Sequence, residues 1–140
     1  MATIIKTIPT QASPEMVWDA LRDIGALHTR VAPGVVTATE LVPGGRQVTF
    51  VGGRTVFEPI VTLDDTHHRL VWSAQGGVTT HYNAAAEVIG DEDGGSIVIW
   101  TADFLPDDLY ETLDRAMTAG AEAMARTFDA ALEALEPLES

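Results

Sequence analysis

The segment between residues 35 and 104 restricts the fold more than any other part of the sequence. It contains six stretches rich in β-branched, aromatic and other apolar residues, separated by short runs of Gly, Pro, Asp and other turn residues. The stretches are residues 35–42, 46–51, 54–63, 69–75, 79–89 and 96–104. A crossover between parallel strands needs about a dozen residues or more, and these turns are shorter. The segment therefore predicts an antiparallel meander of six strands.

Further elements flank this meander. Residues 2–9 predict a first strand, and residues 14–22 predict a helix because Ser13 is a typical N-cap and a proline follows it. A second short helix is predicted around residues 26–31. After Pro106, apolar residues recur at three- and four-residue steps over roughly 28 residues, which is typical of a long helix with one buried face. This order predicts an α+β fold in which a curved seven-stranded antiparallel sheet surrounds a long C-terminal helix.

Length and composition limit the class of protein. The 140 residues fit a single domain over residues 1–140, and 46% hydrophobic residues supply a core. The absence of cysteine excludes disulfides, thiolate metal sites and cysteine nucleophiles. The net charge of −13 repels nucleic acid, which we do not expect as a partner. No stretch approaches the roughly 20 apolar residues of a membrane span and no signal peptide is recognised, so a cytoplasmic protein is expected.

We predict neither a metal site nor a cofactor. His67 and His68 are adjacent, so their side chains are expected to point in different directions. Residues 91–94 resemble the start of a calcium loop but lack its later ligands and its closing Glu. The sequence has neither a Gly-rich phosphate loop nor a nucleophile elbow.

Several short motifs are spread over nearly the whole chain. They are residues 12–18, residues 32–35, residues 58–65, residues 69–72 with Gly76 and Gly77, and residues 100–106. In this order and spacing they resemble the START/Bet v 1-like (SRPBCC) superfamily, most closely its polyketide cyclase/dehydrase and lipid-transport branch. The resemblance implies a helix-grip fold whose sheet and long helix enclose a cavity for lipids, hormones, polyketides or other hydrophobic molecules. Some members catalyse aldol cyclisation and dehydration, some only bind or carry, and some act on partner proteins.

Small residues gather where the long helix is expected to face the sheet. They are Ala116, Gly120 and Ala121 in the helix and Ala84, Ala85 and Ala86 in the fifth meander strand. Such residues predict either an open cavity or close packing of helix against sheet, and the resemblance favours the cavity. If Glu87 faces water, alternation directs Tyr82, Ala84 and Ala86 inward. In residues 96–104 both alternating sets are mostly apolar, so the direction of Trp100 stays open. The predicted ligand-binding residues are Phe57, Trp72, Ala84, Ala86, Trp100, Asp103, Met117, Gly120, Ala121 and Met124.

Three polar residues are candidates for catalysis: Glu58, His28 and Tyr82. By position, Tyr82 and Glu58 resemble the pocket tyrosine and glutamate of plant abscisic-acid receptors, and Trp72 resembles a pocket aromatic. A carboxyl group buried among apolar residues has a raised pKa and can act as a base near neutral pH. The alternatives are a Glu58 that faces water, a Tyr82 at the rim of the cavity and a His28 with a structural role.

The leading hypothesis is a protein that binds a hydrophobic small molecule, polyketide-like or lipid-like, between the sheet and the long helix. Its reaction would be aldol cyclisation or dehydration without a cofactor, in which Glu58 or His28 removes a proton and Tyr82 donates to the enolate oxygen. The alternatives are a non-catalytic carrier or sensor and a partner-binding module of the co-chaperone type. The predicted outward strand faces carry mainly Thr, Arg, Gln and Glu, which favours the cavity. A monomer and a homodimer both fit the sequence.

Overall fold

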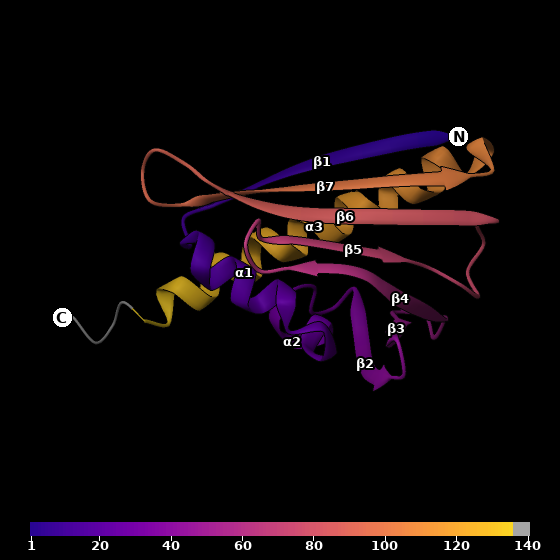
Figure 1. Ribbon diagram of the computed structural model, residues 1–140, viewed down its shortest axis with the longest axis horizontal. Coiled ribbons are helices and arrows are strands. Elements are labelled where there is room, and N and C mark those ends of the chain that lie inside the picture. The colour runs from indigo at the N-terminus through magenta and orange to yellow at the C-terminus, as the bar shows by residue number, and fades with distance from the viewer. Residues whose placement is uncertain (136–140) are drawn as a thin grey trace.

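The computed structural model describes residues 1–135, which form one curved sheet and a long helix across its concave side (Figure 1). The strands are β1 (Ala2–Thr10), β2 (Val36–Val42), β3 (Gly45–Phe50), β4 (Thr55–Asp64), β5 (Arg69–Ser73), β6 (His81–Gly90) and β7 (Ser96–Leu105). The helices are α1 (Pro14–Arg22), the 3-10 turn η1 (Ile24–Ala26), α2 (Leu27–Arg30), the 3-10 turn η2 (Asp107–Leu109) and α3 (Tyr110–Glu133). This is the helix-grip architecture that the sequence predicted.

The seven strands lie in the order β1-β7-β6-β5-β4-β3-β2, and every neighbouring pair is antiparallel. The predicted six-stranded meander is thus confirmed, and β1 joins it beside the last strand. The turn between β2 and β3 brings two backbones unusually close. A Cβ atom on Gly45 would collide with the backbone oxygen of Glu58 on β4. Only glycine fits at this position, which fixes the pairing of β3 with β4 where the candidate site begins.

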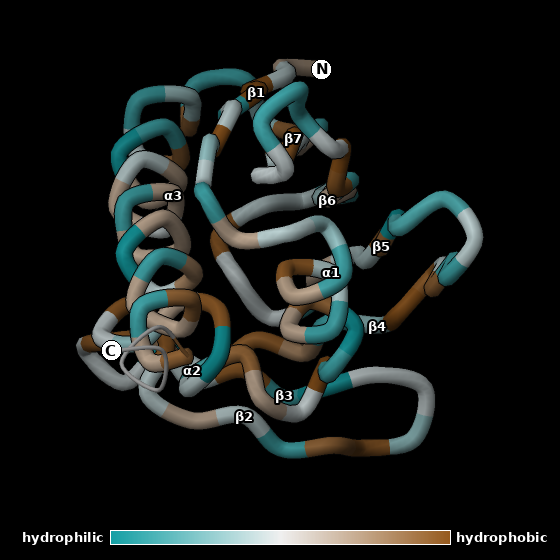
Figure 2. The backbone as a smooth tube through the Cα atoms, turned by 90° about the vertical axis from the view of Figure 1, so that its left-hand side faces the viewer, coloured by the Kyte–Doolittle hydropathy of each residue, from teal (hydrophilic) through white to brown (hydrophobic). Residues whose placement is uncertain are grey.

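The helices lie on the concave side of the sheet. Figure 2 shows the sheet curving from β1 round to β2, with α1 inside the curve and α3 along its open side. α1 begins at a conventional cap, because the Ser13 hydroxyl accepts a hydrogen bond from the backbone N–H of Met16 at 3.3 Å. Within residues 1–135, no helix is long and apolar enough to cross a membrane.

Two polar contacts hold α3 against β1. The ammonium group of Lys6 lies 2.6 Å from Asp114, and the hydroxyl of Thr10 donates to Asp129 at 2.6 Å. The face of α3 turned toward the core carries the buried residues Met117, Gly120, Ala123, Met124 and Phe128. This arrangement positions the middle of α3 over the inner face of the sheet.

The buried stripe of α3 differs from the prediction in two respects. Ala116 is exposed, because one helical step of about 100° carries it away from the buried Met117. The three- and four-residue spacing predicted that the stripe continues to Ala131 and Leu135, but both are exposed, so it ends with Phe128 and the partly buried Leu132. In Figure 1 the yellow C-terminal end of α3 projects past α1, where the sheet does not cover it.

Candidate functional site

A buried ion pair stands on the inner face of the sheet. Arg46 on β3 and Glu58 on β4 are direct neighbours in register, and Arg46 Nε donates to Glu58 Oε1 at 2.8 Å. Only 2% of Arg46 and 7% of Glu58 is exposed. The guanidinium carbon lies 5.5 Å from the centroid of the Trp72 ring, and Nη1 donates to the backbone oxygen of Ile24 at 3.4 Å. Arginine and glutamate are almost never this buried unless they are paired.

Tyr82 belongs to the same transverse row of the sheet. The pairing of Phe57 with Gln75, and of Ser73 with Asn83, places Ala74 between Glu58 and Tyr82. Glu58 and Tyr82 are therefore two strands apart, about 10 Å at the backbone. The residue between the carboxylate and the phenol in this row is thus an alanine, which carries only a methyl group. Tyr82 is half-buried and packs against the core.

Burial changes the acid–base behaviour of both groups. Loss of hydration raises the pKa of the Glu58 carboxyl above its ordinary value, and the nearby Arg46 charge only partly opposes this shift. Burial also raises the pKa of the Tyr82 hydroxyl, and the negative charge of Glu58 raises it further. Tyr82 is therefore a hydrogen-bond donor throughout the neutral pH range, and Glu58 is a stronger base than an ordinary surface carboxylate.

His28 does not join this row. It is half-buried on α2, where its Nδ1 lies 2.9 Å from the hydroxyl of Thr39 on β2. β2 is the edge strand of the sheet, so this contact fastens α2 to the edge. The arrangement matches the alternative in which His28 has a structural role, and we leave His28 out of the proposed chemistry.

The register of β7 answers the question that alternation left open. Trp100 pairs with Ala86 and points inward, and the next inward residue, Ala102, pairs with Ala84. Ala84, Ala86 and Ala102 are all buried, as is Trp72 beside Ala84 on β5. The inner face therefore has a floor of alanines bordered by aromatic rings.

The middle of α3 faces this floor. A Cβ atom on Gly120 would lie 3.1 Å from two carbons of the Trp100 ring, so the ring occupies the space beside the glycine. At Gly120 the structure thus has the close packing that was the alternative to an open cavity. Met117 and Met124 are buried on the same face, and Ala121 is half-buried at its border.

Two predicted ligand-binding residues lie on the opposite face of the sheet. Phe57 stands between the inward residues Val56 and Glu58, so the two-residue alternation turns it outward. Asp103 alternates in the same way with the buried Ala102, and it accepts a hydrogen bond from Thr3. Asp103 lines a shallow depression of about 270 Å³ on the outer face. The prediction that these two residues contact an interior ligand is therefore corrected.

Sequence reasoning missed Arg46. A charged residue at the start of a strand is normally assigned to the surface, and only the pairing of β3 with β4 shows that Arg46 faces Glu58. A signal was present, because the turn at residues 51–54 joins β3 to β4 and could have been used to align these two strands.

A groove between helices was also not predicted. It has a volume of about 740 Å³ and lies between α1, α2 and the C-terminal half of α3. Its walls are mainly apolar, with Met16 and Ala20 from α1 and Phe128 from α3, and its polar residues include Arg30 and Arg126. Residues from three separate segments form the groove, so no local sequence pattern predicts it.

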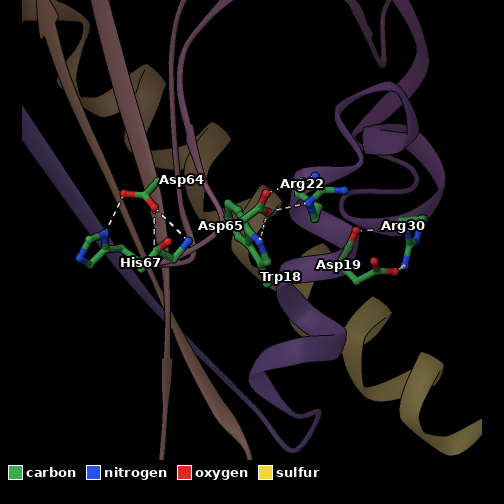
Figure 3. A network of polar contacts seen from close by, with 8 residues as sticks. Trp18, Asp19, Arg22, Arg30, Asp64, Asp65 and His67 are labelled. Atoms are coloured by element: carbon green, nitrogen blue, oxygen red, sulfur yellow. Dashed lines mark hydrogen bonds and ion pairs between the residues drawn. The ribbon is translucent and has the colours of Figure 1, made fainter.

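A polar network holds α1 in place beside this groove (Figure 3). Asp65, in the turn after β4, accepts hydrogen bonds from Trp18 Nε1 and from Arg22 Nε, both at 2.8 Å. The Arg22 contacts, followed by the Trp18 hydrogen bond, hold the pKa of Asp65 below its ordinary value. On the other side of α1, Arg30 binds Asp19 at 2.7 Å. The network joins α1 both to the sheet and to α2.

The adjacent histidines of the same turn diverge, as the sequence predicted. His67 bonds to Asp64 at 2.8 Å, and the ring of His68 stacks on Trp18 with 5.5 Å between centroids. Among residues 1–135, no group of three or more His, Asp or Glu side chains is arranged to hold a metal ion.

Comparison with known structures shows the same architecture elsewhere. The protein XoxI from Bacillus cereus superposes with a TM-score of 0.82 at 22% identity, covering 91% of this chain and 96% of that one. The Zhui aromatase/cyclase from Streptomyces sp. R1128 gives a TM-score of 0.78 at 15% identity, with 91% and 93% covered. Norcoclaurine synthase from Thalictrum gives 0.67 at 16% identity, also with 91% and 93% covered. At these identities the likeness concerns the fold.

Sequence comparison identifies the family. No match is found among curated proteins. Residues 1–138 match the family described as "Polyketide cyclase / dehydrase and lipid transport". This match covers nearly the whole chain, and it agrees with the helix-grip fold, the inward aromatic residues and the long C-terminal helix described above. The chain is a member of the polyketide cyclase/dehydrase and lipid transport family.

Proposed function

We propose that the protein binds a hydrophobic small molecule, polyketide-like or lipid-like, between the inner face of the sheet and α3. Membership of the family supports a role in hydrophobic-ligand binding or cyclisation. The observation that carries the proposal is the buried Arg46–Glu58 pair, which shares its row with Tyr82 on a face that is mainly apolar. In this proposal the pair recognises a polar group of the ligand, and the alanines and aromatic rings contact its apolar body.

The buried pair needs an explanation beyond stability. Removing two charges from water costs free energy that their attraction often does not recover, and apolar residues of the same size are frequently at least as stable. Arg46 donates to Oε1 of Glu58, whereas Oε2 makes no hydrogen bond with the residues that the structure describes. A ligand hydroxyl that donates to Oε2 would complete the hydrogen bonding of the carboxylate.

The position of Glu58 and Tyr82 in one row of the sheet also suits a reaction, which we propose as the second candidate function. The Glu58 carboxylate would remove a proton from the carbon beside a ketone, while the Tyr82 hydroxyl donates to the enolate oxygen. The enolate carbon would then bond to a second carbonyl carbon of the same molecule, whose oxygen takes the proton from Glu58. Loss of water from this product leaves a carbon–carbon double bond in the new ring. The groups stand on either side of Ala74, where the reacting carbons would lie.

A dye titration tests the binding proposal. Nile red, an uncharged apolar dye, is titrated into the folded protein while near-UV circular dichroism reports that the tertiary structure is rigid. We expect saturable binding at one site per chain, because most ligand sites are largely preformed. A rigid circular dichroism signal without any dye binding would overturn the proposal.

Native mass spectrometry of the protein purified from its own host separates the remaining alternatives. A co-purifying small molecule released on denaturation supports binding, and its conversion to a cyclised product supports the enzyme. A released molecule that stays unchanged on incubation favours the carrier or sensor. The partner-binding module predicts no released molecule and no dye binding.

A further inference from the structure

The indole N–H of Trp100 is a buried donor with nothing to bind. Trp100 as a whole is half-buried, but its Nε1 is shielded from solvent and has no hydrogen-bond partner. Among residues 1–135 it is the one side-chain nitrogen or oxygen that is completely shielded from solvent and has no hydrogen-bond partner. Buried polar groups are nearly always hydrogen-bonded, so an unpaired donor in the core calls for a reason.

Packing against α3 does not supply that reason. The contact with Gly120 is made by Cη2 and Cζ3 of the six-membered ring, which carry no polar atom. An apolar aromatic residue could fill space beside the helix without burying an unpaired N–H. The glycine opposite is itself unfavourable in a helix, by about 1 kcal/mol relative to alanine. The unpaired N–H and the helix glycine are both unfavourable, yet together they accommodate an indole at this position.

Trp100 and Tyr82 mark two ends of the alanine floor. Trp100 pairs with Ala86, and Tyr82 lies four residues earlier on β6. Four residues of a strand extend about 13 Å. Between these ends lies the pair Ala84 and Ala102, both buried and both small. The register therefore places two hydrogen-bond donors at the ends of an apolar strip of the inner face, whose length is comparable to that of two or three fused rings.

We infer that the Trp100 indole N–H binds a ketone oxygen of the ligand, at the end opposite to the group recognised by Tyr82 and Glu58. The inference rests on the proposed function, because it needs a ligand in the interior, and it adds the chemistry of that ligand. The substrate class is an elongated apolar molecule that carries an oxygen acceptor at its far end. A purely hydrocarbon tail at that end would leave the indole N–H unpaired.

Two probes of the same shape test this inference: 2-acetylnaphthalene, which carries a ketone, and 2-isopropylnaphthalene, which does not. Their dissociation constants are measured by displacement of Nile red. Tyr82→Phe protein is used first, because it removes the competing hydroxyl donor. We expect Tyr82→Phe protein to bind the ketone about three- to tenfold more tightly than the hydrocarbon, as one hydrogen bond allows. Adding Trp100→Phe should abolish this preference, so that the double variant binds the two probes with equal affinity.

The indole resonance of Trp100 gives a second readout in the unmodified protein. It is identified in a ¹⁵N–¹H spectrum as the indole signal that is lost in Trp100→Phe. Both naphthalene rings can shift this signal, but the ketone should shift it further downfield than the hydrocarbon does, because it accepts a hydrogen bond from the indole N–H. This measurement keeps the inference testable if the double variant fails to fold.

The outcomes separate the inference from the function on which it rests. If neither probe binds, the proposed function fails and the inference fails with it. If both probes bind with equal affinity, or if the ketone preference survives Trp100→Phe, the inference is overturned and hydrophobic binding stands. An indole signal that the ketone shifts no further than the hydrocarbon does also overturns it.

Discussion

Trp100 on β7 and Gly120 on α3 are in direct contact, so that the indole ring fills the place of a helix side chain. A Cβ atom at position 120 would approach the ring to 3.1 Å, which is closer than ordinary van der Waals contact. The distance between the helix and the sheet is therefore set by this pair. Any larger residue at position 120 must displace the ring that also carries the unpaired indole N–H.

The first prediction follows from this contact. Gly120→Leu should lower the free energy of unfolding by about 1–3 kcal/mol, because the leucine overpacks the core against Trp100. Urea unfolding monitored by circular dichroism measures the change. The matched control is Ala119→Leu, one residue earlier on the exposed side of α3, which should stay within about 0.5 kcal/mol of the parent. Equal or greater stability of Gly120→Leu would show that open space adjoins the helix.

The second prediction concerns the buried pair. Arg46→Met should destabilise the protein by about 3 kcal/mol at neutral pH, because the Glu58 carboxylate then lies in the core without its partner charge. Glu58→Gln should cost less, because burial raises the pKa of the Glu58 carboxyl and thus disfavours its charged form in the folded state. Arg69→Met, on the outer side of β5, is the matched control and should change stability little. An Arg46→Met protein as stable as the parent would argue against a charged pair in solution.

The third prediction concerns the replacement of both Arg46 and Glu58, which separates the effect of the buried pair on stability from its effect on ligand recognition. Arg46→Met combined with Glu58→Leu should recover most of the stability lost in Arg46→Met alone, since no charge stays buried. If the pair recognises the ligand, the double variant should still fold and should lose affinity for ligands that carry a hydroxyl group. Retained affinity in a folded double variant would remove the pair from the proposed site.

The fourth prediction is a pH dependence. A carboxyl group whose pKa is higher in the folded than in the unfolded state stabilises the fold when protonated. That contribution is fully present below the unfolded pKa of about 4.5. It is lost as the pH rises through the raised pKa of Glu58. The stability of the parent relative to Glu58→Gln should therefore fall as the pH increases from 4.5, in urea unfolding at a series of pH values. A relative stability that rises over this interval would mean that Arg46 lowers the pKa of Glu58 in the folded state.

The fifth prediction tests how α1 is held. Trp18→Phe removes the hydrogen bond to Asp65 and weakens the stack on His68. Backbone amides of α1 should then exchange with deuterium faster than in the parent, while those of β6 and β7 change little. His67→Ala, in the same turn but bonded to Asp64, is the control and should leave α1 unaffected. Unchanged exchange in Trp18→Phe would show that packing alone fixes the helix.

Local sequence patterns predicted the helices and strands because interactions between residues close in sequence determine them. Ser13 caps α1 as its residue type suggests, and the short turns leave the meander no other topology. Alternation worked in β6, where Glu87 marks the outer face. It could not decide β7, where apolar residues occupy both faces and only the contact with Gly120 shows the direction of Trp100.

The site was predicted less completely because it depends on pairing between strands. Glu58 and Tyr82 were identified, but the partner of Glu58 lies on a neighbouring strand and carries a charge that usually belongs on the surface. Phe57 and Asp103 were placed inside on their residue types and positions, against the alternation of their own strands. The groove between α1, α2 and α3 depends on three segments and has no signature in any one of them.

The pairing of β1 with β7 has a consequence for the order in which the chain can assemble. Ala2 pairs with Phe104 and Thr10 with Ser96, so β1 finds its neighbour only when β7, more than 80 residues later in the chain, has emerged from the ribosome. Contacts between such distant parts of a chain slow folding, because a long loop must close before they form. During synthesis the meander can assemble strand by strand, whereas β1 waits with its backbone groups unpaired. The newly made protein therefore depends on the arrival of its last strand to cover an edge that would otherwise invite aggregation.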